Sequence, residues 1–149
     1  MPKKIRQLHR PADFDLDILS GETDLFRWFL LCYLFGKPIQ SEKAVTTWRL
    51  FIQSKLDTPW AIASASEYEL AMTLQSGGYT RYQHVTARGI RICMDRLIED
   101  YEGSLGLMLE NSQDEAEFSE RLQTLYGVGP KIVEIFMSET DEIFARRVE

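Results

Sequence analysis

The sequence contains little cysteine: among its 149 residues only Cys32 and Cys93 occur, and they lie far apart. Small secreted proteins that depend on disulfides carry many more cysteines, and an iron–sulfur cluster requires four thiolate ligands. We therefore expect two buried thiols in a reducing compartment. The corresponding predictions are a cytoplasmic protein, no iron–sulfur cluster and no metal site.

The sequence also lacks a long apolar run. The most apolar stretch, residues 25–35 (LFRWFLLCYLF), contains Arg27 and is shorter than the roughly 20 residues that cross a bilayer. No apolar segment follows the basic N-terminus (MPKKIRQLHR), as it would in a signal peptide. We expect residues 25–35 to form a buried helix and the protein to make no contact with a membrane.

No segment shows the alternation of polar and apolar residues that is typical of a half-buried β-strand. Apolar residues instead recur at spacings of three and four, which predicts an all-α protein. Because the chain has no long linker, it is expected to form one compact domain over residues 1–149. The predicted helices cover residues 13–20, 41–55, 59–65, 67–77 and 80–101, with a further helix ending at Phe35, a short helix near 105–109 and a last segment over 138–149.

Capping residues and buried faces support several of these helices. Thr58 before Pro59 and Ser66 three residues before Glu69 are typical helix starts, and Thr23 or Asp24 is expected to cap the apolar helix. The expected core residues are Val45, Trp48 and Ile52 in one helix, and Val85, Ile90, Cys93, Leu97 and Ile98 in the longest one.

Charge is distributed unevenly along the chain. The net charge is −6, yet residues 1–10 carry four basic residues and no acid. A second basic group, Arg81, Arg88, Arg91 and Arg96, is opposed only by Asp95. An acidic protein can hold a local phosphate-binding face, although such runs are also typical of solvated surface.

The most informative stretch is residues 125–131 (LYGVGPK). Apolar residues at helical spacing precede and follow it, which predicts two helices joined by a very tight turn within residues 113–138. Gly127 and Gly129 allow close approach of another molecule, and Pro130 suits the first position of the second helix. The N–H groups of such a turn form an anion site, whereas the simpler interpretation is a sharp corner in a helical protein.

The order of these features resembles the helix-hairpin-helix DNA glycosylase superfamily, the group that contains endonuclease III. The resemblance runs from about Asp24 to Lys131. It depends on the apolar helix, the Glu42-Lys43-Ala44 helix, the Thr58-Pro59-Trp60 start, the Gly77-Gly78-Tyr79 end, the long helix ending in Tyr101-Glu102-Gly103, and the glycine turn. It implies a DNA-glycosylase-like fold with residues 1–22 as a basic N-terminal extension and residues 113–138 as a helix-hairpin-helix.

The resemblance implies a base-excision-repair protein that binds double-stranded DNA and flips a base out of the duplex. Gly127, Val128 and Gly129 would contact phosphates, with a monovalent cation at the hairpin. Lys131 occupies the place of the lysine that attacks the sugar C1′ as a Schiff-base nucleophile in bifunctional members. Burial and the positive end of a helix favour the neutral amine that such attack needs, and a phosphate contact is the alternative role.

The family's catalytic aspartate has no clear match in this sequence. Glu149 is nearest by spacing and Asp141 is the other candidate, although both also fit surface carboxylates. The family's inserted glutamine is also missing, so Gln40 or Phe35 would fill the gap left by a flipped base. Further DNA contacts are expected from the residues after the double glycine and the basic group beyond them: Tyr79, Arg81, Tyr82, His84 and Arg88.

Three functions remain open from the sequence: a DNA glycosylase or apurinic-site lyase, a non-catalytic helix-hairpin-helix module that binds DNA, and a helical protein-interaction domain. The sequence indicates neither the lesion nor the oligomeric state.

Overall fold

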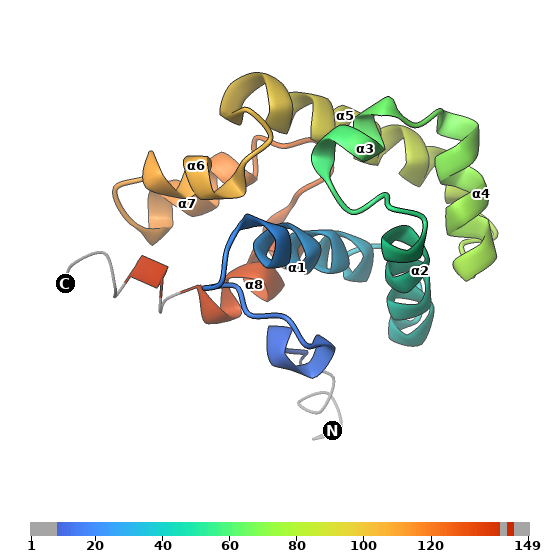
Figure 1. The fold of residues 1–149 in the computed structure, drawn as a ribbon, viewed down its shortest axis with the longest axis horizontal. Coiled ribbons are helices and arrows are strands. Elements are labelled where there is room, and N and C mark those ends of the chain that lie inside the picture. Colours follow the sequence, from blue (N-terminus) through green and yellow to red (C-terminus); the bar gives the residue numbers. More distant parts are fainter. Residues whose placement is uncertain (1–8, 141–142, 145–149) are drawn as a thin grey trace.

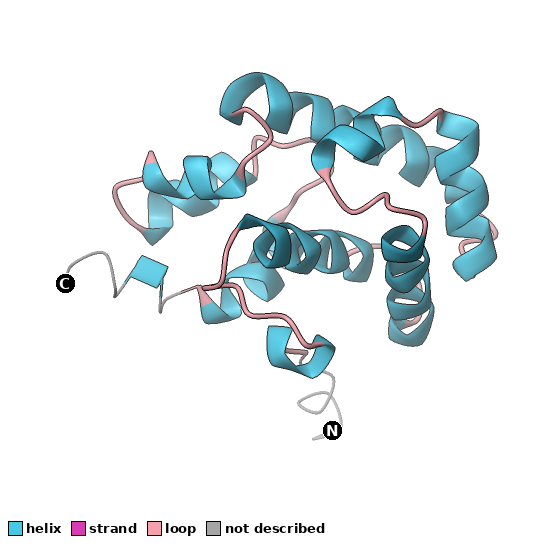
Figure 2. Ribbon diagram, viewed as in Figure 1, coloured by secondary structure: helices cyan, strands magenta, loops and turns pink. Residues whose placement is uncertain are grey.

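The computed structural model describes residues 9–140 and 143–144, and every regular element in this part of the chain is a helix (Figure 2). The predicted all-α class is confirmed. The elements in chain order are the 3₁₀ helix η2 (Pro11–Phe14), α1 (Glu22–Phe35), α2 (Ser41–Gln53), α3 (Pro59–Ser64), α4 (Glu67–Gly77), α5 (Gln83–Tyr101), α6 (Leu105–Glu110), α7 (Glu115–Leu122), α8 (Pro130–Phe136) and the 3₁₀ helix η3 (Met137–Glu139).

Helix α1 occupies the centre of the molecule (Figure 1). Helices α2, α6 and α8 all contact it, while α3 and α4 pack on the long helix α5. As a result, α8 near the end of the chain lies directly against α1 near its beginning.

From Leu25 to Phe35 every residue of α1 except Arg27 is buried, as this apolar run predicts. The helix begins two or three residues earlier than expected, because Gly21 at φ 150° precedes it in a backbone conformation that favours glycine. The prediction that Thr23 or Asp24 caps the helix is wrong. The Asp24 carboxylate instead accepts a hydrogen bond from the Asp17 N–H at 2.9 Å, which attaches the preceding loop to α1.

Two further predictions at helix boundaries are wrong. Residues 13–20 do not form a helix: η2 ends at Phe14, and Asp15 takes a left-handed conformation with φ 61°. Helix α5 begins at Gln83 rather than at Thr80. Its expected core residue Val85 is 68% exposed, because it lies on the outer face of the first turn.

The buried face of α2 also differs from the prediction. Trp48 is buried as expected, but Val45 and Ile52 are only half-buried while Ala44, Thr47 and Phe51 are buried. The Trp48 indole N–H donates to the Arg27 carbonyl at 2.8 Å, which fixes the rotation of α2 against α1. The pattern of apolar residues in α2 alone does not predict this contact with another helix.

The predicted caps of α3 and α4 are confirmed. The Thr58 hydroxyl accepts from the Ala61 N–H and the Ser66 hydroxyl accepts from the Glu69 N–H, each at 3.0 Å. Helix α4 ends where Gly78 takes φ 120°. Of the last predicted segment, Ile143 and Phe144 pack against the core as expected, and the remainder beyond Thr140 lies outside the described residues.

A carboxylate from α1 caps α6 across the chain. The two oxygens of Glu22 accept hydrogen bonds from the Leu105 N–H at 2.8 Å and the Gly106 N–H at 2.9 Å. These N–H groups have no partner inside a helix, so Glu22 satisfies donors that the first turn leaves free. The contact joins the start of α1 to the segment that leads to α7.

The turn between α7 and α8 is anchored by two buried residues, Leu125 and Val128. Gly127 has φ 81°, and a Cβ atom added there would lie 2.6 Å from the Tyr33 hydroxyl oxygen on α1. Gly129 differs: its φ of −110° suits any residue, and a Cβ atom added there would meet nothing within 4 Å. The fold therefore requires glycine at 127 but not at 129, and Pro130 occupies the first turn of α8 as predicted.

Among the described residues, no helix combines the length and the apolar character that would be needed to cross a membrane.

Replacing Glu22 with alanine is expected to destabilise the protein, because it leaves two N–H groups of α6 without their acceptor. The expected loss is about 1–2 kcal/mol, measured as the free energy of unfolding in urea. The matched control is Glu115→Ala, which also removes a first-turn carboxylate but none that contacts another element. Equal stability of the two variants would contradict the assigned cap.

Gly127→Ala is expected to lower the melting temperature by several degrees, because alanine at this φ costs roughly 1–2 kcal/mol before the contact with Tyr33 is counted. Gly129→Ala is expected to lower the melting temperature less, since its backbone conformation is unstrained and a Cβ atom meets nothing there, and the only expected loss comes from the poorer N-cap that alanine makes for α8. Differential scanning calorimetry of both variants tests the contrast. A larger loss at position 129 than at 127 would overturn it.

Candidate nucleic-acid interface

Lys131 lines a cavity of about 700 Å³ between α8 and the N-terminal part of the chain. One wall comes from α8 and the residues after it: Lys131, Glu134, Ile135, Ser138 and Glu139. The facing wall comes from the end of α1, the loop after it and the first described residues: Phe35, Ile39, Ser41, His9 and Arg10. The cavity thus combines an amine, carboxylates and aromatic rings.

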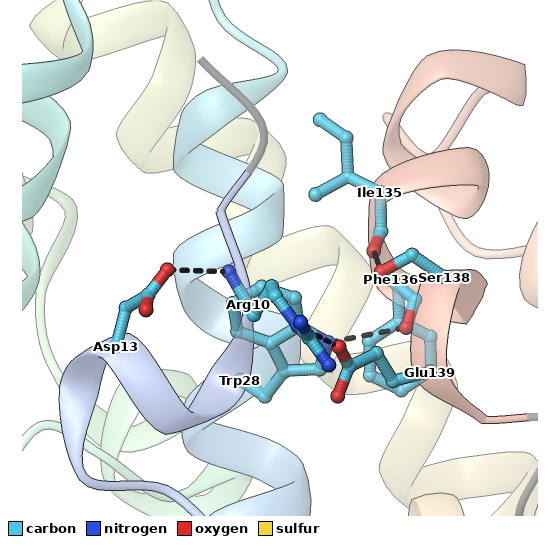
Figure 3. A network of polar contacts seen from close by, with 7 residues as sticks. All are labelled: Arg10, Asp13, Trp28, Ile135, Phe136, Ser138 and Glu139. Carbon is cyan, nitrogen blue, oxygen red and sulfur yellow. Dashed lines mark hydrogen bonds and ion pairs between the residues drawn. The ribbon is translucent and has the colours of Figure 1, made fainter. Parts of the chain in front are cut away.

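The α8 wall is held firmly against α1. The Trp28 indole N–H donates to the Phe136 carbonyl at 3.1 Å (Figure 3). A Cβ atom added at Gly36 would lie only 2.3 Å from the Ile132 side chain, so the loop after α1 packs on α8 without space for a larger residue. Lys131 precedes Ile132 directly, and its backbone position is therefore fixed by the core.

Glu139 forms an ion pair with Arg10 at the edge of this cavity (Figure 3). The Arg10 N–H also donates to the Asp13 carboxylate at 3.1 Å, so η2 orients the arginine backbone. Arg10 belongs to the basic extension for which the sequence predicted a solvated or DNA-facing role. Here its side chain partly neutralises a carboxylate that lies 129 residues further along the chain.

The ring of His9 stacks on Phe35, with centroids 4.6 Å apart and planes at 11°. The Nε2 atom of His9 is buried without a hydrogen-bond partner among the described residues. A buried polar atom in this state is a free donor or acceptor for a ligand. Phe35 is only 8% exposed beneath this ring, so its side chain is covered, whereas Gln40, the other candidate to replace a flipped base, is exposed.

The side chain of Lys131 is exposed, so the prediction that burial favours its neutral amine is wrong, and it forms no ion pair with a described residue. Glu134 follows it by three residues on α8, which places both on one face of the helix and in one cavity. Glu134 is not among the residues predicted from the sequence, although its spacing from Lys131 is visible there. The earlier candidates Asp141 and Glu149 lie outside the described residues.

Tyr79 has a structural role that the sequence did not indicate. It is 3% exposed, and its hydroxyl donates to the Leu34 carbonyl at 3.0 Å. Burial raises the pKa of this phenol above its ordinary value, so it stays protonated and continues to donate. Stacking of a base on Tyr79 would require the loop after α4 to open.

The other predicted DNA contacts from this region are exposed but not gathered in one place. The Arg81 guanidinium lies over the Tyr82 ring, 5.6 Å from its centroid, and both line a second cavity together with Tyr79. Arg88 forms an ion pair with Glu67 at 3.2 Å. Neither Arg88 nor His84 lines either cavity.

Metal ligands are scarce in the described part of the chain, where no group of three or more His, Cys, Asp or Glu residues is arranged to hold an ion. Cys32 and Cys93 are both buried, as predicted, and burial raises the pKa of Cys93 to about 12. Two buried thiols do not fit an iron–sulfur cluster.

No protein-family model matches the sequence, and a comparison with curated proteins finds no match. Among solved structures, the chain is similar to one described as a trapped endonuclease III–DNA covalent intermediate, an estranged-adenine complex, with a TM-score of 0.58 and 22% sequence identity. The similarity covers 92% of this chain and 54% of the other, so the chain spans about half the length of that protein. The protein therefore has an endonuclease III-like helical fold.

Proposed function

We propose that the protein binds double-stranded DNA at the turn before α8 and acts as a DNA glycosylase or apurinic-site lyase, with Lys131 as the nucleophile. The observation that carries the proposal is the position of Lys131, beside an exposed glycine turn and in a cavity with two carboxylates. The likeness to a protein solved as a covalent complex with DNA supports it at the level of the fold.

The chemistry requires a neutral amine and a nearby carboxylate. The Lys131 nitrogen would form a bond to C1′ of the sugar while the bond from C1′ to the base, or to the hydroxyl of an abasic site, breaks with its electron pair. The proton that the amine loses on attack goes to the departing group, and a carboxylic acid protonates the ring oxygen as the sugar ring opens to leave an iminium ion. The resulting carboxylate can then accept the proton released from C2′. Loss of a C2′ proton then expels the 3′ phosphate and cleaves the strand.

Glu134 and Glu139 are the described carboxylates that could move these protons or stabilise positive charge on the sugar. Glu139 forms an ion pair with Arg10, whereas Glu134 forms no ion pair within the described residues. We therefore propose Glu134 as the proton-transfer group and Glu139 as the electrostatic one. Asp141 and Glu149 remain the alternative carboxylates that the family resemblance implies.

A second function, a non-catalytic DNA-binding module, is favoured by one observation. The Lys131 amine forms no ion pair with any described carboxylate, and Glu139 is already paired with Arg10. In that case Lys131 would be a cation that contacts a phosphate. A protein-interaction domain that binds no nucleic acid is the third outcome that the following experiments distinguish.

Borohydride is expected to trap a covalent complex between the protein and DNA that contains an abasic site, because it reduces the iminium ion at Lys131. Lys131→Ala is expected to abolish the complex on denaturing gels, and Lys55→Gln, which removes an exposed lysine outside both cavities, is expected to retain it. Duplex binding without trapping would instead establish the non-catalytic module. Absence of both would exclude a DNA function.

Gly129→Val is expected to weaken binding of double-stranded DNA by about 10-fold or more, because its side chain would hold a phosphate away from the turn N–H groups. The substitution should not affect folding, since position 129 has open space and an ordinary backbone conformation. Fluorescence anisotropy with labelled duplex measures the affinity, and circular dichroism checks the fold. Unchanged affinity in a folded Gly129→Val protein would rule out the turn as a phosphate contact.

A further inference from the structure

The second cavity, of about 490 Å³, lies between the loop after α1 and the loop after α4. Three basic side chains line it, Lys37, Lys43 and Arg81, and no acidic residue does. In a protein whose net charge is −6, three cations gathered without a carboxylate create a local positive potential. We name it the basic cavity.

Many basic side chains elsewhere are paired with acids, although Arg49, Lys55, Arg91 and Lys131 also form no ion pair with a described residue. Within the described residues, the arginines at positions 10, 27, 88, 96 and 121 each form an ion pair with an aspartate or glutamate. None of the three cations of the basic cavity does. These cations are therefore free to bind an anion from outside the protein.

Of the three basic residues that line the cavity, Lys37 has the most unusual environment. It is half-buried, and its ammonium lies 4.3 Å from the centroid of the Tyr33 ring. Burial lowers the pKa of Lys37 below its ordinary value, because the charged form loses hydration that no carboxylate replaces. A bound anion would stabilise the charged form of Lys37, so this environment favours binding of an anionic ligand.

Lys43 and Arg81 are exposed side chains that each contact another residue of the same cavity. The aliphatic stem of Lys43 lies against Gly78, where an added Cβ atom would come within 2.8 Å of it. Arg81 stacks over Tyr82, whose ring is 44% exposed at the cavity wall. The Lys43 ammonium and the Arg81 guanidinium, which has five donors, suit the oxygens of a phosphate, and the partly exposed Tyr82 suits an attached nucleoside.

The volume and the position of the basic cavity indicate that the phosphate it binds belongs to a larger molecule, a polynucleotide strand. Its volume lies within the roughly 300–1,000 Å³ range of pockets for small ligands, so it has room for more than a bare ion. Ile39 lines both this cavity and the Lys131 cavity, so the two cavities are adjacent and share the loop after α1. One polynucleotide strand can therefore occupy both.

We propose that the basic cavity is a phosphate-binding site that takes a backbone phosphate of the same DNA molecule that the Lys131 cavity engages. This proposal rests on the proposed DNA function and adds a second contact to it, made by Lys37, Lys43 and Arg81.

The test is a double variant, Lys43→Gln with Arg81→Gln, which leaves the half-buried Lys37 and its contact with Tyr33 intact. Its control is Arg49→Gln with Lys55→Gln, which changes the net charge equally at exposed residues that line neither cavity. Duplex affinity is measured by fluorescence anisotropy across a range of salt concentrations. We expect the cavity variant to bind about 10-fold more weakly and to lower the salt slope by about one to two.

The control variant is expected to keep the wild-type slope. If wild-type protein binds duplex and the cavity variant binds with the same affinity and slope, the basic cavity is not a phosphate site while the DNA function stands. If wild-type protein binds no DNA, the proposed function fails, and a thermal-shift titration with pyrophosphate decides the site. A saturable stabilisation that the cavity variant lacks would keep a phosphate site for a source other than DNA, and no stabilisation would overturn it.

Discussion

The burial of α1 on all sides is the constraint on which the rest of the structure depends. A helix without a polar face must be covered by several neighbours at once, and α2, α6 and α8 cover this one. Polar contacts then fix each neighbour in place: the Trp48 indole on the Arg27 carbonyl, the Trp28 indole on the Phe136 carbonyl, and the Glu22 carboxylate on α6. The segments that bear the candidate sites are thus attached to one rigid core helix.

The charges of the protein are divided between structure and surface in a way that reconciles its acidity with an anionic ligand. Several carboxylates serve as caps, as Asp114 does for α7 and Glu22 does for α6. Others neutralise arginines on the outer faces of helices. Unpaired cations line both cavities, while Arg49, Lys55 and Arg91 are unpaired elsewhere. The net charge of −6 therefore does not describe the local charge at the two cavities.

Sequence reasoning succeeded where local chemistry decides the structure. Thr58 and Ser66 cap helices through residues three positions away, and the apolar α1 could only be a buried helix. It failed where distant residues decide, as in the rotation of α2 that Trp48 sets against Arg27. The cavity around Lys131 is also formed by residues that are distant in the sequence. It depends on His9, Arg10 and Glu139, and no local pattern brings the two ends of the chain together.

The contact between Trp28 and Phe136 has a consequence for synthesis of the protein. The two residues are 108 positions apart, so α1 leaves the ribosome long before the helix that covers it exists. During that interval an almost wholly apolar segment has only part of its final surroundings, a state that exposes a chain to aggregation. Folding is therefore completed late, and the glycine turn and Lys131 reach their final positions only when the last helices close on α1.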